Sequence, residues 1–175
     1  MVSRIGPSLA VPVVLCLFAF PPPALSQEAP EGRTVALSDM EMYYEASGKG
    51  PPLLLLHGFT ESGRMWDPFV KALAGKYQVL VPDLRGHGGS TNPGGQFTMR
   101  QSARDVLALL DHLKIGRVRA VGASAGAMTL LHMATQQPDR VEAMVLVGGG
   151  TYFSAACRDL LQGFGLEDLR DFDVR

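Results

Sequence analysis

The distribution of apolar and polar residues along the chain predicts strands that alternate with helices. Residues 33–37 and 40–46 have strand-type patterning around a Ser-Asp turn, which predicts a hairpin. The continuous apolar run from Leu53 to Leu56 is typical of a strand buried on both faces. Further strands are expected at 77–83, 118–122 and 141–149, and helices at 64–74, from Thr98 to Leu113, and at 125–137. This alternation predicts an α/β domain with a mainly parallel sheet and helices on both faces.

The helical segments show one-sided apolar spacing and recognisable end signals. In the two better-marked helices the inward-facing apolar residues are Trp66, Val70 and Leu73, and Val106, Leu107, Leu110 and Leu113. Gly75 ends the first helix. Thr98 with Gln101 three residues later has the spacing of a capping box.

Residues 1–26 predict a secretory signal peptide and not a part of the core. Arg4 precedes an apolar run over 9–20, and positions 24–26 read Ala-Leu-Ser, with small residues at both key places of a cleavage site. A membrane anchor is the alternative reading, but the run is too short to cross about 30 Å of hydrocarbon. We therefore expect an exported protein, periplasmic or secreted, with no stable membrane anchor after cleavage.

Charge and cysteine content narrow the classes of function. With 16 Lys plus Arg against 17 Asp plus Glu, the chain lacks the basic footprint of a nucleic-acid-binding protein. No histidine cluster, cysteine pair or phosphate loop calls for a metal or an organic cofactor, so we expect none. Signal cleavage leaves Cys157 as the one cysteine, which predicts a free thiol or a partner cysteine elsewhere. A catalytic Cys157 is the alternative, but no strand–turn–helix segment frames it.

The segment Gly122-Ala-Ser-Ala-Gly126 is a candidate nucleophile site. It fits G-x-S-x-G between an expected strand and an expected helix. A sharp turn there brings the backbones close together, so Gly122 and Gly126 are needed, and it lifts the hydroxyl of Ser124 clear of the sheet. The alternative is a plain turn in which Ser124 caps the helix.

The loop that begins at His57 is a candidate for stabilising a developing oxyanion. Such an anion needs two aimed backbone N–H donors. Ala125, directly after the serine, would supply one, and Phe59 would supply the other, with His57 and Gly58 shaping the loop. An ordinary glycine turn is the alternative.

A third polar loop, 83–90, holds Asp83, Arg85, His87 and Ser90. These residue types could be drawn as a catalytic cluster. We instead interpret them as a loop held by its own hydrogen bonds.

Together these three motifs resemble the α/β-hydrolase superfamily, over about residues 33–152. Their order and spacing match the family's core motifs in its N-terminal two-thirds. The resemblance implies a serine-nucleophile branch, because the dehalogenase and epoxide-hydrolase branches use aspartate at the position of Ser124. It implies a small-molecule, ester-like substrate and does not separate esterases, lactonases, carbon–carbon bond hydrolases and perhydrolases.

The family's triad runs serine, acid, histidine along the chain, and this sequence offers no suitable acid or histidine after Ser124. The resemblance places the acid and the histidine after strands seven and eight, whereas the expected strands end at the sixth, whose residues 141–148 become the edge of the sheet. Of the four histidines, His57 is needed under the oxyanion loop, and His87 would start about 10 Å away, two strand spacings from Ser124. The remaining two, His112 and His132, fall within helices, where packing or surface roles are the default.

Two hypotheses follow for the chain, whose expected parts are a signal peptide (1–26), a partial α/β-hydrolase core (27–152) and the start of a lid or helix (153–175). In the first, it is the N-terminal part of an exported serine hydrolase completed by a missing C-terminal segment. In the second, it is a non-catalytic, degenerate hydrolase or binding module.

Overall fold

The structure, a computed structural model, describes residues 31–150. The expected signal peptide, the expected lid segment and Cys157 lie outside the described residues. The strands are β1 (Glu31–Ala36), β2 (Glu41–Ser47), β3 (Pro52–Leu56), β4 (Gln78–Pro82), β5 (Val118–Ala123) and β6 (Val141–Val147). The helices are α1 (Asp67–Ala74), α2 (Met99–His112) and α3 (Ala125–Gln136), with 3₁₀ turns at Gly63–Trp66 and Pro138–Arg140.

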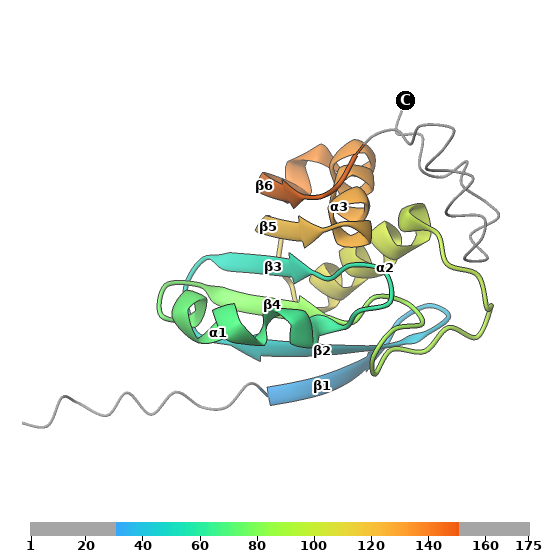
Figure 1. Cartoon of the computed structure of the whole chain (residues 1–175), viewed down its shortest axis with the longest axis horizontal. Coiled ribbons are helices and arrows are strands. Elements are labelled where there is room, and N and C mark those ends of the chain that lie inside the picture. Colours follow the sequence, from blue (N-terminus) through green and yellow to red (C-terminus); the bar gives the residue numbers. More distant parts are fainter. Residues whose placement is uncertain (1–30, 151–175) are drawn as a thin grey trace, which may run out of the picture.

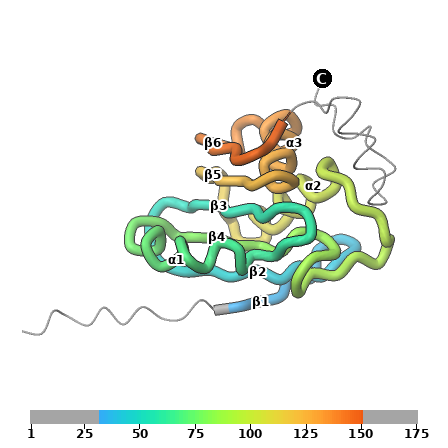
Figure 2. The backbone as a smooth tube through the Cα atoms, in the orientation of Figure 1, coloured from blue at the N-terminus to red at the C-terminus, as the bar shows by residue number. Residues whose placement is uncertain are grey.

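The six strands form one mixed sheet in the order β1-β2-β4-β3-β5-β6 (Figure 1). β1 and β2 form the expected antiparallel hairpin, and β2 pairs antiparallel with β4. From β4 onwards the pairing is parallel, with Leu54 opposite both Leu80 of β4 and Ala120 of β5. The fold class expected from the sequence, a partial α/β-hydrolase core, is confirmed. Because β3, β4 and β5 are parallel and adjacent, the loops that follow them meet at one edge of the sheet, as the tube in Figure 2 shows.

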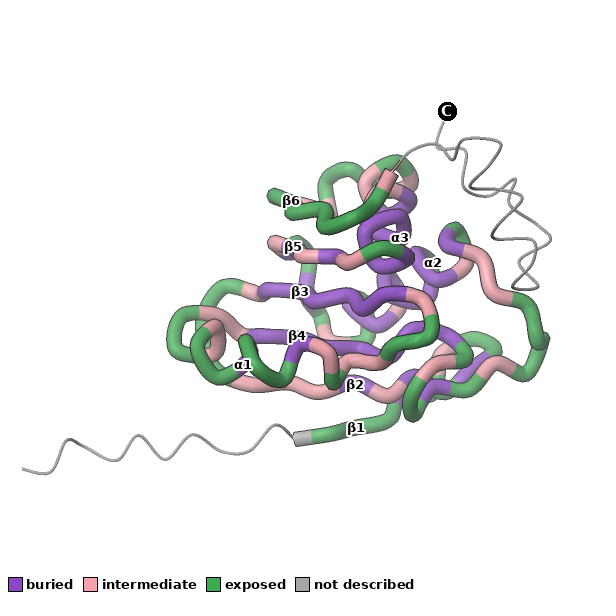
Figure 3. The backbone as a smooth tube through the Cα atoms, in the orientation of Figure 1, coloured by how far each residue is buried: buried purple, intermediate pink, exposed green. Residues whose placement is uncertain are grey.

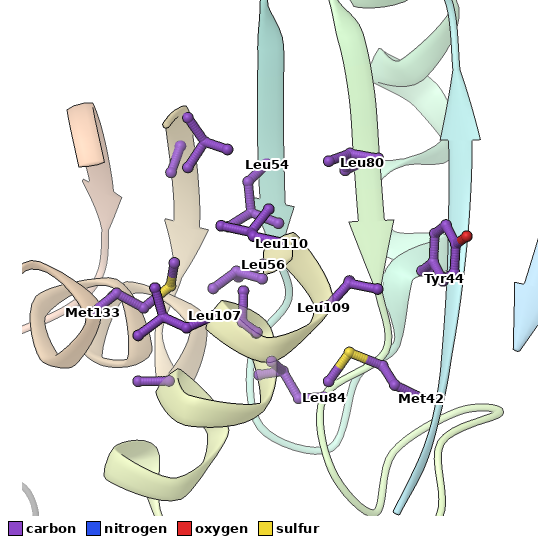
Figure 4. Packing of buried hydrophobic residues seen from close by; sticks show 14 of the residues in the cluster. Met42, Tyr44, Leu54, Leu56, Leu80, Leu84, Leu107, Leu109, Leu110 and Met133 are labelled. Carbon is purple, nitrogen blue, oxygen red and sulfur yellow. The ribbon is translucent and has the colours of Figure 1, made fainter. Parts of the chain in front are cut away.

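Two apolar layers cover the faces of this sheet. The larger lies between the sheet and the helices α2 and α3, and Figure 4 shows much of its packing. Its members include Met42, Leu54, Leu56, Leu80, Val106, Leu110, Leu130 and Met133, which are all fully buried or nearly so. The smaller layer lies beneath α1 and consists of Leu53, Leu55, Trp66, Val70, Val79 and Val81. Alternate residues of β3 thus face opposite layers, which is why this strand is apolar throughout.

Two local expectations change in the structure. The segment 64–74 is not one helix: a 3₁₀ turn ends at Trp66 and α1 begins at Asp67, with Pro68 in its first turn. Proline suits the first helical turn because it has no N–H to leave unpaired. The capping box forms only by half, because Thr98 Oγ1 accepts from the Gln101 N–H while the Gln101 side chain turns to Asp105.

β6 is the outermost strand of the sheet formed by residues 31–150, and it is poorly covered (Figure 3). Val145 and Val147 are 58% and 52% exposed, and Met144 and Leu146 on the other face are each 38% exposed. The apolar edge expected at 141–148 is therefore present in the described part of the chain.

Candidate active site

Ser124 lies on a strained turn between β5 and α3. Its φ of 49° and ψ of −112° fall in a region that residues with a Cβ rarely occupy. Its backbone N–H donates to the Val147 carbonyl at 2.8 Å, which ties the turn to the end of β6. The side chain is exposed and makes no capping hydrogen bond to α3. Ser124 occupies the N-cap position of α3, but its side chain does not cap the helix, whereas a capping serine has extended backbone and a bonded side chain.

The two glycines around Ser124 are required by close backbone approach. A Cβ on Gly122 would lie 2.6 Å from the Ala127 nitrogen. A Cβ on Gly126 would lie 2.7 Å from the His57 carbonyl oxygen and would also collide with that of Leu56. The end of β5 can thus turn into α3 only if Gly122 lacks a side chain, and the start of α3 can pass over the end of β3 only if Gly126 lacks one.

The loop after β3 lies directly beside Ser124. A Cβ added to Gly58 would lie 3.6 Å from the Ser124 Cβ. The Phe59 side chain packs against the buried cluster that includes Ala125 and Met128 at the start of α3. The Ala125 amide belongs to the first turn of α3, where N–H groups have no acceptor within the helix. The structure thus places Ala125 directly after Ser124 and the Gly58–Phe59 loop beside it, and the role of Phe59 and Ala125 as oxyanion donors stays a prediction.

His57 connects the loops after β3 and β4. Its ring is completely buried, and Nδ1 lies 2.7 Å from the Gly58 carbonyl oxygen. The Leu84 N–H donates to Nε2 at 2.8 Å. A carbonyl oxygen only accepts and an N–H only donates, so the proton must be on Nδ1. Burial lowers the pKa of His57 below its ordinary value of 6.5. His57 therefore joins the two loops through both ring nitrogens and has no nitrogen left with which to act as a base.

The Asp83 carboxylate holds the 83–90 loop through internal hydrogen bonds. It accepts from the Gly63 N–H at 2.6 Å and from the Gly89 N–H at 2.7 Å. Ser90 Oγ donates to the Asp83 carbonyl and accepts from the Tyr43 N–H. These bonds agree with a structural reading of the loop.

Arg85 anchors the same loop to α2 by a buried ion pair. Nε and Nη2 donate to both oxygens of Asp105 at 2.8 and 2.9 Å, and both partners are 3% exposed. A second pair to the exposed Asp39 completes the network. These hydrogen bonds raise the pKa of Arg85, and the bond from Arg85 lowers the pKa of Asp39. Arg85 is thus fully occupied within the fold.

None of the four histidines is bonded to Ser124 in the described residues, where its hydroxyl makes no side-chain hydrogen bond. His87 lies against the loop that follows the neighbouring strand β3, with its ring centroid 5.3 Å from that of Phe59. His112 is at the far end of α2, and His132 is buried two turns along α3.

Phe97 is a residue near the site that sequence reasoning missed. It lies in the loop before α2 and its ring is 5.5 Å from that of Phe59 and 5.1 Å from that of His87. No motif marks it, since only the folded loop brings it near the Phe59 loop.

A helix of sufficient length and hydropathy to cross a bilayer was not found within residues 31–150.

A separate polar hollow of about 380 Å³ opens on the other side of the Asp83 loop. Tyr43, Glu45, Arg64 and Asp83 are among its lining residues. Tyr43 Oη donates to Glu45 at 2.9 Å, which raises the pKa of this tyrosine. Ser124 does not line this hollow, so it is distinct from the candidate active site.

Comparisons with known proteins agree with this geometry. A family model described as alpha/beta hydrolase fold matches residues 51–172. The chain therefore belongs to the alpha/beta hydrolase family, and the resemblance expected from its three motifs is confirmed.

Individual relatives are similar over about two-thirds or more of this chain. A soluble epoxide hydrolase from Corynebacterium sp. (strain C12) is 35% identical over 63% of this chain and 39% of its own length. A fluoroacetate dehalogenase from Burkholderia sp. is 36% identical over 67% of this chain and 40% of its own. A hydrolase from Pseudomonas aeruginosa PA01 superposes with a TM-score of 0.70 at 30% identity, over 79% of this chain and 55% of that one. The chain spans about two-fifths of the length of these curated relatives.

Proposed function

We propose that the chain carries the nucleophile half of an exported serine hydrolase. In this proposal Ser124 attacks a carboxylic ester or a related acyl group and forms an acyl-enzyme. The observation that carries it is the exposed Ser124 hydroxyl, held at a positive φ on the N-terminus of α3. Backbone strain of this kind costs about 1–3 kcal/mol and persists where function requires it.

The chemistry follows from the groups around the serine. Ser124 Oγ bonds to the acyl carbon as its proton passes to a base, and the carbonyl oxygen becomes an oxyanion. The N–H groups of Phe59 and Ala125 donate to that oxyanion. Collapse of this intermediate expels the protonated alcohol, and water then releases the acid and restores Ser124. Loss of one such donor typically costs about 100- to 1,000-fold in kcat.

We infer that the base and its orienting acid come from chain that this sequence does not contain. All four histidines lie within the described residues, and none of them is hydrogen-bonded to Ser124 there. Relatives that extend well beyond the matched region support this inference. The coding DNA after Arg175 tests it, because an in-frame continuation should encode a late aspartate and a late histidine.

A second candidate is a non-catalytic protein that retains the fold. It is favoured by the Ser124 hydroxyl, which makes no hydrogen bond to a base within residues 31–150. In that case neither this chain nor an extended one turns over esters.

Serine at position 124 favours acyl hydrolysis over the reactions named for the two curated relatives. The family resemblance assigns aspartate to this position in the epoxide-hydrolase and dehalogenase branches. A carboxylate nucleophile forms an ester that water can cleave, whereas a serine attacking an alkyl carbon would leave a stable ether. Serine is therefore suited to acyl substrates.

Export rests on the pattern of residues 1–26. The secreted or periplasmic protein should begin at Gln27 or within a few residues of it, as N-terminal sequencing can determine. Exported material that still begins at Met1 would refute this part of the proposal.

The experiment for the reaction compares p-nitrophenyl ester hydrolysis by two proteins, the 175-residue chain and a version extended through the late aspartate and histidine. The extended protein should be active, and the 175-residue chain should lose nearly all activity because the remaining parts of such a site retain only about 10³–10⁴ over water. Ser124→Ala should abolish the activity, and the exposed control Ser38→Ala should not change it.

Two outcomes would contradict this proposal in different ways. Robust turnover by the 175-residue chain that Ser124→Ala removes would show that the base is present here, and His87→Ala would be assayed next. Activity of the extended protein that is indifferent to Ser124→Ala would show that the nucleophile is wrongly assigned.

A further inference from the structure

Three aromatic rings from three different loops meet beside Ser124. Phe59 follows β3, His87 follows β4, and Phe97 precedes α2. The ring centroids are 5.3 Å apart for Phe59 and His87, 5.1 Å for His87 and Phe97, and 5.5 Å for Phe59 and Phe97. The rings are tilted or edge-on to one another, which is the preferred geometry of aromatic pairs. We call these three residues the aromatic wall.

The aromatic wall rests on the first turn of α3. Phe59 and Phe97 pack against a buried cluster formed by Met99, Ala125 and Met128, and Ala125 directly follows Ser124. All three rings of the wall are only half-buried, although the three residues of the cluster beneath them are buried. The wall is thus a partly open apolar surface over the helix turn that begins directly after the exposed Ser124.

His87 adds one polar atom to this surface. Its Nδ1 lies 2.9 Å from the Arg85 carbonyl oxygen, which can only accept, so Nδ1 carries a proton. In the neutral ring Nε2 is therefore a hydrogen-bond acceptor. Within residues 31–150 Nε2 has no hydrogen-bond partner, and it is not sealed from solvent.

We propose that the aromatic wall binds an aryl group of the substrate, and that His87 Nε2 accepts a hydrogen bond from a hydroxyl on that aryl ring. The substrate class is then hydroxyaryl esters. An aryl ring fits three tilted rings by stacking and edge contacts, and its hydroxyl fills the open acceptor. A ligand without a donor would cover Nε2 and leave it unpaired, which costs affinity. This inference rests on the proposed function, since the wall serves catalysis only if Ser124 is the nucleophile.

Binding to the full 175-residue chain tests this inference without requiring turnover. The probes are methyl 3-hydroxybenzoate and methyl 3-methoxybenzoate, in which a methyl ether replaces the phenolic hydroxyl and so removes the donor. Ligand-detected saturation-transfer NMR titration gives both dissociation constants and also works if the chain self-associates. The hydroxy ester should bind about three- to tenfold more tightly, the range expected of one neutral hydrogen bond.

Two variants separate recognition from folding. His87→Phe keeps a ring in the wall and removes the acceptor, so the two esters should bind equally, with the methoxy ester unweakened. A purely structural role of His87 would instead weaken both esters together. Phe97→Leu should weaken both and reduce saturation transfer to the aryl protons, and it supplies the test if His87→Phe does not fold.

Equal affinity of the parent chain for the two esters would overturn the inference, as would a preference that survives His87→Phe. Aryl binding that is unchanged in Phe97→Leu would also overturn it. Failure of the proposed function has a different signature: the His87-dependent preference persists, but Ser124 proves unreactive in the extended protein. The exposed control Ser38→Ala should leave both dissociation constants unchanged.

Discussion

Ser124→Gly should stabilise the chain, because the strain at this turn comes from the Cβ. At a φ of 49° and a ψ of −112°, a residue with a Cβ has about 1–3 kcal/mol of strain, whereas glycine adopts such angles readily. Glycine also lowers the free energy of unfolding by about 0.4–1 kcal/mol, because it gives the unfolded chain more conformational freedom. The expected net gain is about 1 kcal/mol. Ser124→Ala is the matched control, since it removes the hydroxyl and keeps the Cβ.

Urea unfolding followed by Trp66 fluorescence measures this difference. Trp66 is the one tryptophan of the chain and is only 9% exposed, so its emission reports on the core beneath α1. With a slope of about 1.5 kcal/mol per M, a gain of about 1 kcal/mol raises the midpoint by roughly 0.7 M. Ser124→Ala should stay near the parent midpoint. A glycine variant no more stable than the alanine variant would refute the strained-turn reasoning.

Three further predictions concern the supports of the site. Arg85→Met removes the ion-pair partner of the buried Asp105 carboxylate and should lower the free energy of unfolding in urea by about 3–5 kcal/mol. Arg119→Met breaks an ion pair whose side chains are about 40% exposed and should lower it by less than about 1 kcal/mol. Equal losses in the two variants would contradict the buried network. Because burial lowers the pKa of His57 in the folded state, the unfolded chain takes up its proton first, so stability should fall as pH drops below about 6.5. His57→Gln should flatten this dependence of stability on pH; an unchanged dependence in that variant would show that other groups cause it. Val145→Lys on the uncovered β6 should reduce self-association in light scattering, and a monomeric parent chain would show that the edge is harmless.

The sequence predicted most of the fold because its strands are marked by unambiguous patterns. A strand such as β3, apolar at each of its four leucines, can only be buried on both faces. The glycines at 122 and 126 likewise indicated close backbone approach, which the contacts of α3 with the end of β3 bear out. Local chemistry was less well predicted where tertiary contacts compete. The Gln101 side chain bonds to Asp105, whose carboxylate also holds the buried Arg85, and so leaves the capping box.

The parts of the site that escaped prediction depend on loop conformation. Strand spacing put His87 about 10 Å from Ser124, but it could not show that the His87 ring packs against Phe59. That contact depends on the conformation of the 83–90 loop, which the hydrogen bonds of Asp83 and Arg85 hold in place. Phe97 carried no signal, since an aromatic residue in a polar loop has no periodicity to reveal its neighbours. Contacts of this kind arise from long-range hydrogen bonds that a pattern along the chain does not encode.

The central claim, that Ser124 is a hydrolase nucleophile activated from outside this sequence, is tested most directly by labelling with a fluorophosphonate. Labelling needs an activated hydroxyl, and peptide mass mapping locates the adduct. In the extended protein the adduct should form on Ser124, and in the 175-residue chain the same residue should label only weakly. An adduct on a different residue of an active extended protein, or equally fast labelling of Ser124 in both proteins, would contradict the account.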